Sequence, residues 1–315
     1  MFEHIARQIY FAPVAILPAT FDAIDRQFTA ILEQRLRLDP MAPRDSLAAA
    51  CRALQPYPVR QLSAAQHFRL SSVSDRWDPN DRAEDDPLPL CEFNPRTGVG
   101  LLRVWGVIGK HLSWLDAACG GCDLATIDRA IDTISAHHGL RALVVDFRSP
   151  GGSVAGVMET AEKLRSLAVP TYAYTEDMCA SAAYWLASAC QGGIFSPPSA
   201  TVGSIGVYCA AIDRSAQLEA AGVAVRVFRT GPYKAVNLMG RGINEAEAAR
   251  LQAGVDSVFA DFLTALDTGR KLDSYDPEAL KGEAWMATHA PRGVTDAADV
   301  PTLADFLGLV ASMHS

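Results

Sequence analysis

A glycine-rich segment in the middle of the chain is the first candidate for chemistry. Ser149 to Ser153 have the sequence SPGGS and follow the apolar run Ala142 to Phe147 after one residue, Arg148. Gly151 and Gly152 allow a sharp turn into the next predicted helix, and their amide N–H groups can then bind an oxyanion or another anion. A tight strand-to-helix turn whose glycines serve only packing explains this segment alone equally well.

A serine surrounded by small residues is the second candidate. Ser181 lies between Ala180 and Ala182, at the predicted beginning of a helix over residues 180–189. The small neighbours leave room for a substrate backbone, and a helix N-terminus stabilises negative charge near the hydroxyl. Taken alone, a serine in this place is most often a helix cap.

A lysine that follows a predicted strand and a turn is the third candidate. Lys234 ends the sequence GPYK that begins at Gly231. A lysine acts as a base only where burial or a neighbour lowers its pKa toward neutrality, which an apolar pocket beside Tyr233 would do. A solvated surface lysine is the alternative interpretation, and it holds for most lysines.

The elements that must position these residues alternate between strands and helices. Short apolar, β-branched runs predict buried strands over residues 100–108, 142–147, 171–175, 193–196, 204–209 and 223–229. Predicted helices cover residues 124–137, 154–166, 180–189, 215–221 and a long segment from the Asn244–Glu247 capping box to Gly269. This alternation implies βαβ crossovers and a largely parallel sheet, so the predicted class is α/β.

Four regions follow from changes in composition along the chain. Residues 1–72 carry apolar positions at helical spacing around Phe21 to Leu32 and predict a small helical segment. Residues 73–97 are rich in Asp, Pro and Arg and predict a polar linker. Residues 98–306 are expected to form one catalytic domain, and residues 307–315 a C-terminal tail.

Charge and cysteine content restrict the classes of function. The formal net charge is −8 and no dense Lys/Arg run occurs, which argues against nucleic acid or an anionic membrane as a partner. The apolar stretch from Ile9 to Phe21 is too short to span a bilayer and has no basic start, so neither a membrane anchor nor a secretory signal is expected.

Cys119 and Cys122 form a CGGC motif, but no second ligand pair completes a metal site. Seven cysteines, an odd number, favour a reducing compartment.

The three candidate segments occur together in the order and spacing of one family. From about Val99 to Val300 the chain resembles the signal peptide peptidase A family of serine peptidases, which share the ClpP/crotonase-type fold. The matching segments are SPGG at 149–152, ASAAY at 180–184, VGSIGV at 202–207 and GPYK at 231–234. Within this family the chain looks most like the phage capsid (prohead) proteases. The resemblance implies a layered fold of repeated β-β-α or βαβ units.

The resemblance also implies a role for each site residue. Ser181 is the expected nucleophile, Lys234 its general base, and Ser204 the hydroxyl that orients the lysine amine. The amides of Gly151 or Gly152, together with that of Ala182, are the expected oxyanion hole. Such a Ser-Lys dyad requires no metal and no organic cofactor.

Two positions depart from the family pattern. Arg148 stands where the family usually has Asp or Asn, and the serine is followed by two alanines where the family usually has two glycines. Neither departure removes a reacting group, but both would alter the substrate cleft.

The resemblance further implies protein or peptide substrates, with capsid, scaffold or portal proteins as candidates, and a homo-oligomer in which one subunit's edge completes the next one's cleft. The expected location is the cytoplasm of a bacterial host, in association with a prohead.

Three alternatives stay open from the sequence. An acyl-CoA enzyme of the same fold would use the glycine amides for a thioester enolate and would need no Ser-Lys pair. A catalytically idle minor capsid protein would retain the fold alone. A cellular signal-peptide-peptidase-like protease would be membrane-associated. A Ser-His-Asp triad has no clear support, because His137 and His138 lie before the SPGG strand and His111 and His289 lie in segments without an acidic partner motif.

Overall fold

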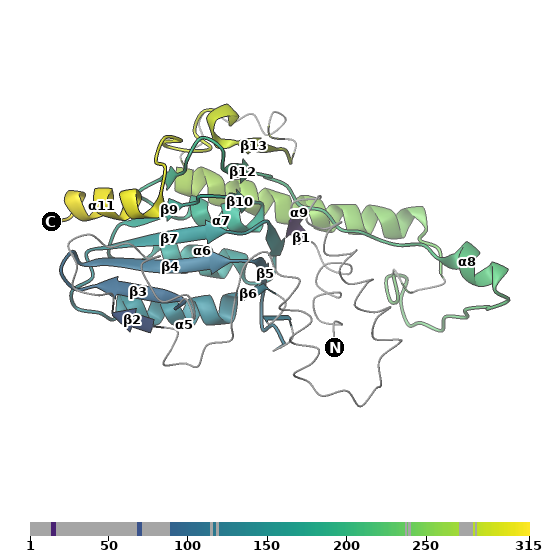
Figure 1. Ribbon diagram of the computed structural model, residues 1–315. Helices are drawn as coiled ribbons and strands as arrows, with labels where there is room; N and C mark the ends of the chain where they lie inside the picture. The colour runs from purple at the N-terminus through teal and green to yellow at the C-terminus, as the bar shows by residue number, and fades with distance from the viewer. Residues whose placement is uncertain are drawn as a thin grey trace.

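The structure is a computed structural model, and it describes residues 14–16, 68–70, 89–113, 116–117, 120–236, 238, 241–270, 280 and 282–315. Figure 1 shows layers of strands and helices from which one long helix and an extended segment project. The strands are β1 (Val14–Ile16), β2 (Phe68–Leu70), β3 (Cys91–Asn94), β4 (Val99–Trp105), β5 (Val107–Gly109), β6 (Gly121–Asp123), β7 (Ala142–Arg148), β8 (Gly151–Ser153), β9 (Thr171–Tyr174), β10 (Met178–Ala180), β11 (Ile194–Phe195), β12 (Thr201–Gly203) and β13 (Ala284–Met286). The helices are α5 (Leu124–Ser135), α6 (Val157–Arg165), α7 (Ala182–Ser188), α8 (Ser215–Ala220), α9 (Glu245–Arg270), the 3₁₀ turn Ala287–His289 and α11 (Leu303–Met313).

The largest sheet forms the centre of the molecule. Its order is β11-β9-β7-β4-β3-β2, and all neighbours are parallel except the antiparallel pair β3 and β4. One face packs against α5, α6 and α7, and the other packs against α11. Because both faces are covered, β4 and β7 are buried along nearly their whole length and consist of near-continuous apolar runs.

Two small sheets lie at the end of β7 and carry the candidate segments. The first has the order β1-β8-β5-β6, and the second has the order β10-β12-β13. Strand β8 contains the glycine-rich segment. Strand β10 runs directly into Ser181 and pairs in parallel with β12.

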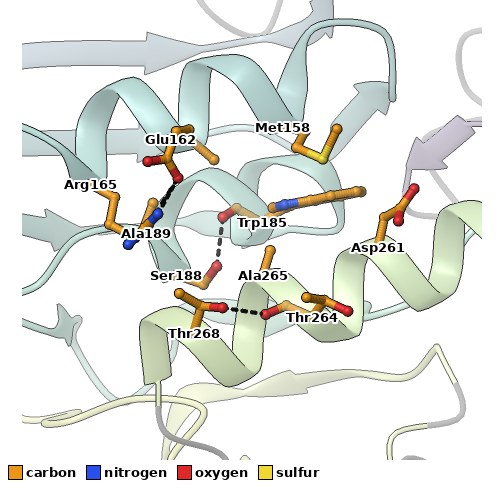
Figure 2. Close-up of a pocket in the computed structure, with 11 residues that line it drawn as sticks. Met158, Glu162, Arg165, Trp185, Ser188, Ala189, Asp261, Thr264, Ala265 and Thr268 are labelled. Carbon is orange, nitrogen blue, oxygen red and sulfur yellow. Dashed lines mark hydrogen bonds and ion pairs between the residues drawn. The ribbon is translucent and has the colours of Figure 1, made fainter.

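Helix α9 connects this core to the projecting part of the molecule. The predicted capping box forms, because the Glu247 amide donates to Asn244 Oδ1 (2.9 Å) and the Asn244 amide donates to Glu247 Oε2 (3.2 Å). Near the other end of α9, the buried Phe262 stacks on Trp185 of α7 with ring centroids 4.6 Å apart. A pocket of about 180 Å³ lies between α6, α7 and α9 beside this stack (Figure 2).

The projecting segment is residues 206–236, which we call the arm. No residue of the arm is buried, and the side chain of Phe228 is 94% exposed. In Figure 1 the arm extends away from the sheets along the outer part of α9, with α8 at its far end.

The α/β class with a largely parallel sheet is confirmed, but two predicted strands are wrong. Residues 204–209 leave the sheet because Ser204 takes a positive φ of 52° at the end of β12, so the strand lies earlier, at 201–203. Residues 223–229 have strand-like composition but no neighbouring strand in the described part of the chain. They lie extended in the arm.

The boundaries of the predicted regions also differ. Within the predicted linker 73–97, the structure describes residues 89–97, and β3 there is entirely buried because Cys91 and Phe93 pack into the core. Residues of the predicted tail 307–315 belong largely to α11, whose Leu307 and Val310 are buried. The helix predicted around residues 21–32 lies outside the described residues, and the described parts of 1–72 are the strands β1 and β2.

Candidate active site

Ser181 occupies a sharp turn between a strand and a helix. It follows β10 and precedes α7, with φ 58° and ψ −120°. Its amide donates to the Gly203 carbonyl over 2.7 Å, which fixes the turn against β12. The side chain is buried, and its hydroxyl has no hydrogen-bond partner among the described residues. A strained strand-to-helix turn that presents an unpaired serine hydroxyl is the geometry of a nucleophile elbow.

Ser204 lies beside Ser181. Strands β10 and β12 are parallel with Ala180 opposite Gly203, so the next residue of each strand, Ser181 and Ser204, occupies neighbouring positions. Adjacent strands are about 4.8 Å apart. The Ser204 amide donates to the Glu283 carbonyl over 2.7 Å, which holds the residue at this end of the sheet. The structure therefore brings together two of the serines that the sequence singled out.

The glycine-rich turn is attached to the strand that carries Ser181. The amide of Ser149 donates to the Met178 carbonyl (2.8 Å), and the Ala180 amide donates to the Ser149 carbonyl (3.1 Å). The Ser149 hydroxyl is buried and donates to the Gly106 carbonyl over 2.6 Å. These bonds hold the turn beside β10, next to Ser181.

Glycine is needed at the two positions of this turn for different reasons, and one of the two amides already donates a hydrogen bond. Gly151 has φ 96°, which favours glycine, and its amide already donates to Ser149 Oγ over 3.2 Å. At Gly152 a β-carbon would come within 2.1 Å of the Ile108 carbonyl oxygen, so only glycine fits. Ala182 is the first residue of α7, where a helical amide has no partner within its own helix.

Lys234 lies on the arm and is exposed. A turn in which its amide donates to the Gly231 carbonyl (3.2 Å) fixes its backbone. Among the described residues, no hydrogen bond or ion pair joins its ammonium group to Ser181, Ser204 or any other side chain. The apolar pocket beside Tyr233 that the sequence predicted is absent from the described residues, since Tyr233 is itself exposed.

An ion-pair cluster that sequence reasoning missed holds the lysine segment in place. Glu247 is buried at the start of α9 and accepts from Arg229 over 2.8 Å and also from Arg241. Arg229 donates in turn to the carbonyl of Lys234 over 3.3 Å. Hydrogen bonds from Arg241 and Arg229 lower the pKa of the Glu247 carboxyl from 4.5 to about 2.

The only sequence signal for this cluster was the capping box, which explains Glu247 by its backbone role alone. The arginine partners have no fixed spacing from Glu247 and follow from the tertiary structure.

Arg148 takes part in a second cluster, on the face of β7 that packs toward α11. Its guanidinium lies 4.3 Å from the ring centroid of Trp105, 3.5 Å from Asp146 and 3.2 Å from Glu176. Asp146 is buried and accepts from Trp105 Nε1 over 2.9 Å, and its burial raises the pKa of its carboxyl. These contacts give Arg148 a structural role at the end of β7.

Within the described ranges no group of three or more His, Cys, Asp or Glu side chains is arranged to hold a metal ion. Cys122 of the CGGC motif is buried, which raises the pKa of its thiol to about 12, and Cys119 lies outside the described residues. None of the described helices is long and apolar enough to cross a bilayer.

The fold and the site together define an α/β protein with a serine at a strand-to-helix elbow. Residues 163–295 match the model of Peptidase family S49. Over these residues the chain is therefore similar to the peptidases of family S49. The match includes Ser181, Ser204 and Lys234 and begins after the glycine-rich turn.

Two curated relatives and one solved structure illustrate the extent of similarity. A Synechocystis sp. protein, slr0021, which is named a protease only provisionally, is 32% identical over 42% of this chain and 48% of its own length. Capsid assembly protease C of Escherichia phage lambda is 27% identical over 48% of this chain and 35% of its own. A crystal structure of a probable enoyl-CoA hydratase/isomerase from Mycobacterium abscessus is 15% identical, with TM-score 0.28, over 59% of this chain and 84% of that chain. The matched region spans less than half the length of each of these two relatives.

Proposed function

We propose that the protein is a serine endopeptidase in which Ser181 is the nucleophile and Lys234 the general base. The observation that carries this proposal is the elbow at Ser181, where an unpaired hydroxyl lies beside Ser204 and the glycine-rich turn. The match of residues 163–295 to the model of Peptidase family S49 supports it.

The reaction proceeds in two steps. The Ser181 hydroxyl attacks a peptide carbonyl and gives its proton to the neutral Lys234 amine, and the lysine then protonates the leaving amine as the C–N bond breaks. Water hydrolyses the resulting ester of Ser181. The amides of Gly152 and Ala182 stabilise the tetrahedral oxyanion, each by about 3 kcal/mol. Gly151 joins them if its amide turns away from Ser149.

The exposed position of Lys234 bears on how the dyad assembles. A lysine must lose solvent before its amine is neutral near pH 7, and the described part of one chain supplies no such enclosure around Lys234. We therefore propose a homo-oligomer in which the arm of one copy brings Lys234 to Ser181 and Ser204 of its neighbour.

Mixing two inactive variants tests the nucleophile, the base and the assembly together. Ser181→Ala and Lys234→Ala are each expected to lose cleavage of dye-labelled casein, whereas Ser188→Ala, at another buried serine at the end of α7, is expected to retain it. Refolding the two inactive variants together should restore about a quarter of the sites, because random pairing joins an intact serine to an intact lysine in that fraction. No recovery would show that the dyad lies within one chain, and full activity of Lys234→Ala would remove the lysine from the mechanism.

For the biological substrate we propose phage or prophage head proteins, that is, capsid, scaffold or portal proteins cleaved in the cytoplasm of a bacterial host. The similarity to capsid assembly protease C supports this assignment. Co-expression of wild type or Ser181→Ala with the neighbouring head genes, followed by mass mapping of new protein termini, tests it. Termini that depend on Ser181 are expected in head proteins, and membrane association with cleavage of signal peptides would favour the cellular alternative.

A further inference from the structure

A short strand from the beginning of the chain lies on the glycine-rich strand of the site. Strand β1 pairs antiparallel with β8, with Val14 opposite Ser153, Ala15 opposite Gly152 and Ile16 opposite Gly151. Strand β1 also contacts α7, the helix that begins immediately after Ser181. Residues nearly 140 positions apart in the sequence therefore meet beside the proposed nucleophile.

This pairing uses the last open edge of β8. In the sheet order β1-β8-β5-β6, β8 lies between β1 and β5, so both of its edges have partners. An extended peptide binds a sheet by adding a strand to a free edge, where the main-chain groups supply the hydrogen bonds. With β1 in place, β8 has no free edge for a substrate, and Gly151 to Ser153 are all buried.

We infer that β8 is the edge on which extended polypeptide substrates bind, and that residues 14–16 occupy it as an intramolecular inhibitor. This inference rests on the proposed function, because it places the substrate next to Ser181 and the glycine amides. The occupying sequence is Val-Ala-Ile, without a charged residue.

The sequence around β1 favours a reversible inhibitor. Pro13 and Pro18 flank the strand, and neither has an amide to donate to a longer ladder. A strand of three residues makes few ladder hydrogen bonds, and each contributes little in net terms because water replaces it on release. A competing polypeptide with a longer pairing segment can therefore displace it.

Two neighbouring proline substitutions test the pairing within the full chain. In an antiparallel pair, successive amides point to opposite sides, so one of Ala15→Pro and Ile16→Pro removes an amide that faces β8 and the other removes one that faces away. We expect the variant that loses an amide facing β8 to show faster hydrogen exchange at Gly151 to Ser153 and faster casein cleavage, each by about three- to tenfold. The other variant is the matched control and is expected to behave as wild type.

A reversible covalent lock provides the opposite test. Directly opposed residues of an antiparallel pair have the separation that a disulfide needs, so Val14→Cys combined with Ser153→Cys should form one. We expect oxidation to abolish casein cleavage by the double variant and reduction to restore it. The two single-cysteine variants, which carry the same native thiols, are expected to show no such redox dependence.

The outcomes separate this inference from the proposed function. If wild type cleaves casein but neither proline variant nor the oxidised lock changes exchange or rate, residues 14–16 are no inhibitor and the peptidase assignment stands. If a proline variant raises exchange at β8 but no variant ever cleaves, the occupancy stands and the peptidase assignment fails.

Discussion

The backbone at Ser181 is held in a conformation that a residue with a β-carbon rarely adopts. With φ 58° and ψ −120°, the strain is of order 1–3 kcal/mol, and the bond from the Ser181 amide to Gly203 helps to maintain it. At the proposed nucleophile, such strain would fix the direction of the side chain before substrate arrives. The stability of the protein is then expected to increase when the reactive residue is replaced by one without a β-carbon.

Glycine at position 181 should make that cost measurable. We expect the free energy of unfolding of Ser181→Gly to be about 1 kcal/mol higher than that of Ser181→Ala, because glycine accepts the positive φ. Both variants are expected to be inactive. Chemical denaturation measures the difference. At Ser188, the last residue of α7, the order should reverse, since glycine loses more backbone entropy than alanine on folding and no positive φ favours it there. Equal stabilities of the two Ser181 variants would show that the elbow is unstrained.

The carboxyl of Glu247 should give the protein a defined acid sensitivity. Its pKa is about 2 in the folded chain and 4.5 ordinarily, so its stabilising contribution is complete above about pH 4.5 and is lost as the pH falls toward 2. Glu247→Gln is expected to unfold at a lower temperature than wild type at pH 6, with a difference that shrinks toward pH 2. Thermal scans over this range measure it. Glu245→Gln, at an exposed position in the same turn, should follow the wild-type curve.

At the scale of the elements, α9 couples the lysine segment to the serine helix. Its first turn holds Glu247 and thereby Arg229, and its other end packs Phe262 on Trp185 of α7. Figure 2 shows α7 and α9 side by side at the pocket that Trp185 lines, with Ala265 and Thr268 of α9 near Ser188. Loss of the Phe262 contact should therefore affect both stability and the position of α7.

Replacing a phenylalanine by alanine should have different effects at the buried Phe262 and at the exposed Phe228. Phe262→Ala is expected to lower the free energy of unfolding by about 3–5 kcal/mol and to reduce activity, because it opens a cavity against Trp185. Phe228→Ala, on the arm, should change the free energy of unfolding by less than about 0.5 kcal/mol in the isolated chain. Denaturant titration at low protein concentration measures both. A large loss from Phe228→Ala would mean that the arm packs within its own chain.

The accuracy of sequence-based prediction varies with how local its signal is. The runs at 142–148 and 124–135 and the Asn244–Glu247 cap were predictable, because periodicity and capping depend on neighbouring residues. The strand expected at 223–229 was wrong, because its composition suits a pleated surface but no strand of the described residues lies beside it. Ser181 and its turn were predicted, whereas the arginines around Glu247 and the pairing of β1 with β8 are contacts between distant segments that no local pattern records.

At the scale of the whole molecule, the arm is a surface that the described residues of one chain leave uncovered. Val223, Val225 and Phe228 are exposed along it, together with Arg226 and Arg229. Under the proposed oligomer, this mixture of apolar and basic side chains contacts the next copy and carries Lys234 with it.

Sedimentation of the wild type and of Phe228→Ala tests this view of the arm. The wild type is expected to sediment as an oligomer at micromolar concentration, and the variant should shift toward the monomer with a parallel loss of casein cleavage, since removing a buried aromatic anchor costs an interface about 2 kcal/mol or more. Leu309→Ala, an exposed apolar residue on α11, is the control and should leave the oligomer intact. A monomeric but fully active wild type would contradict a dyad shared between copies.

Strands β1 and β8 belong to one covalent chain, so inhibition by residues 14–16 would depend on the concentration of substrate and not on that of the protein. A tethered segment acts at an effective concentration of about millimolar order, which does not change when the protein is diluted. A free substrate competes on equal terms only when it reaches a similar local concentration. Cleavage should then begin where substrate chains are crowded together and stay low where they are dispersed, so the enzyme would respond to the density of its substrate as well as to its sequence.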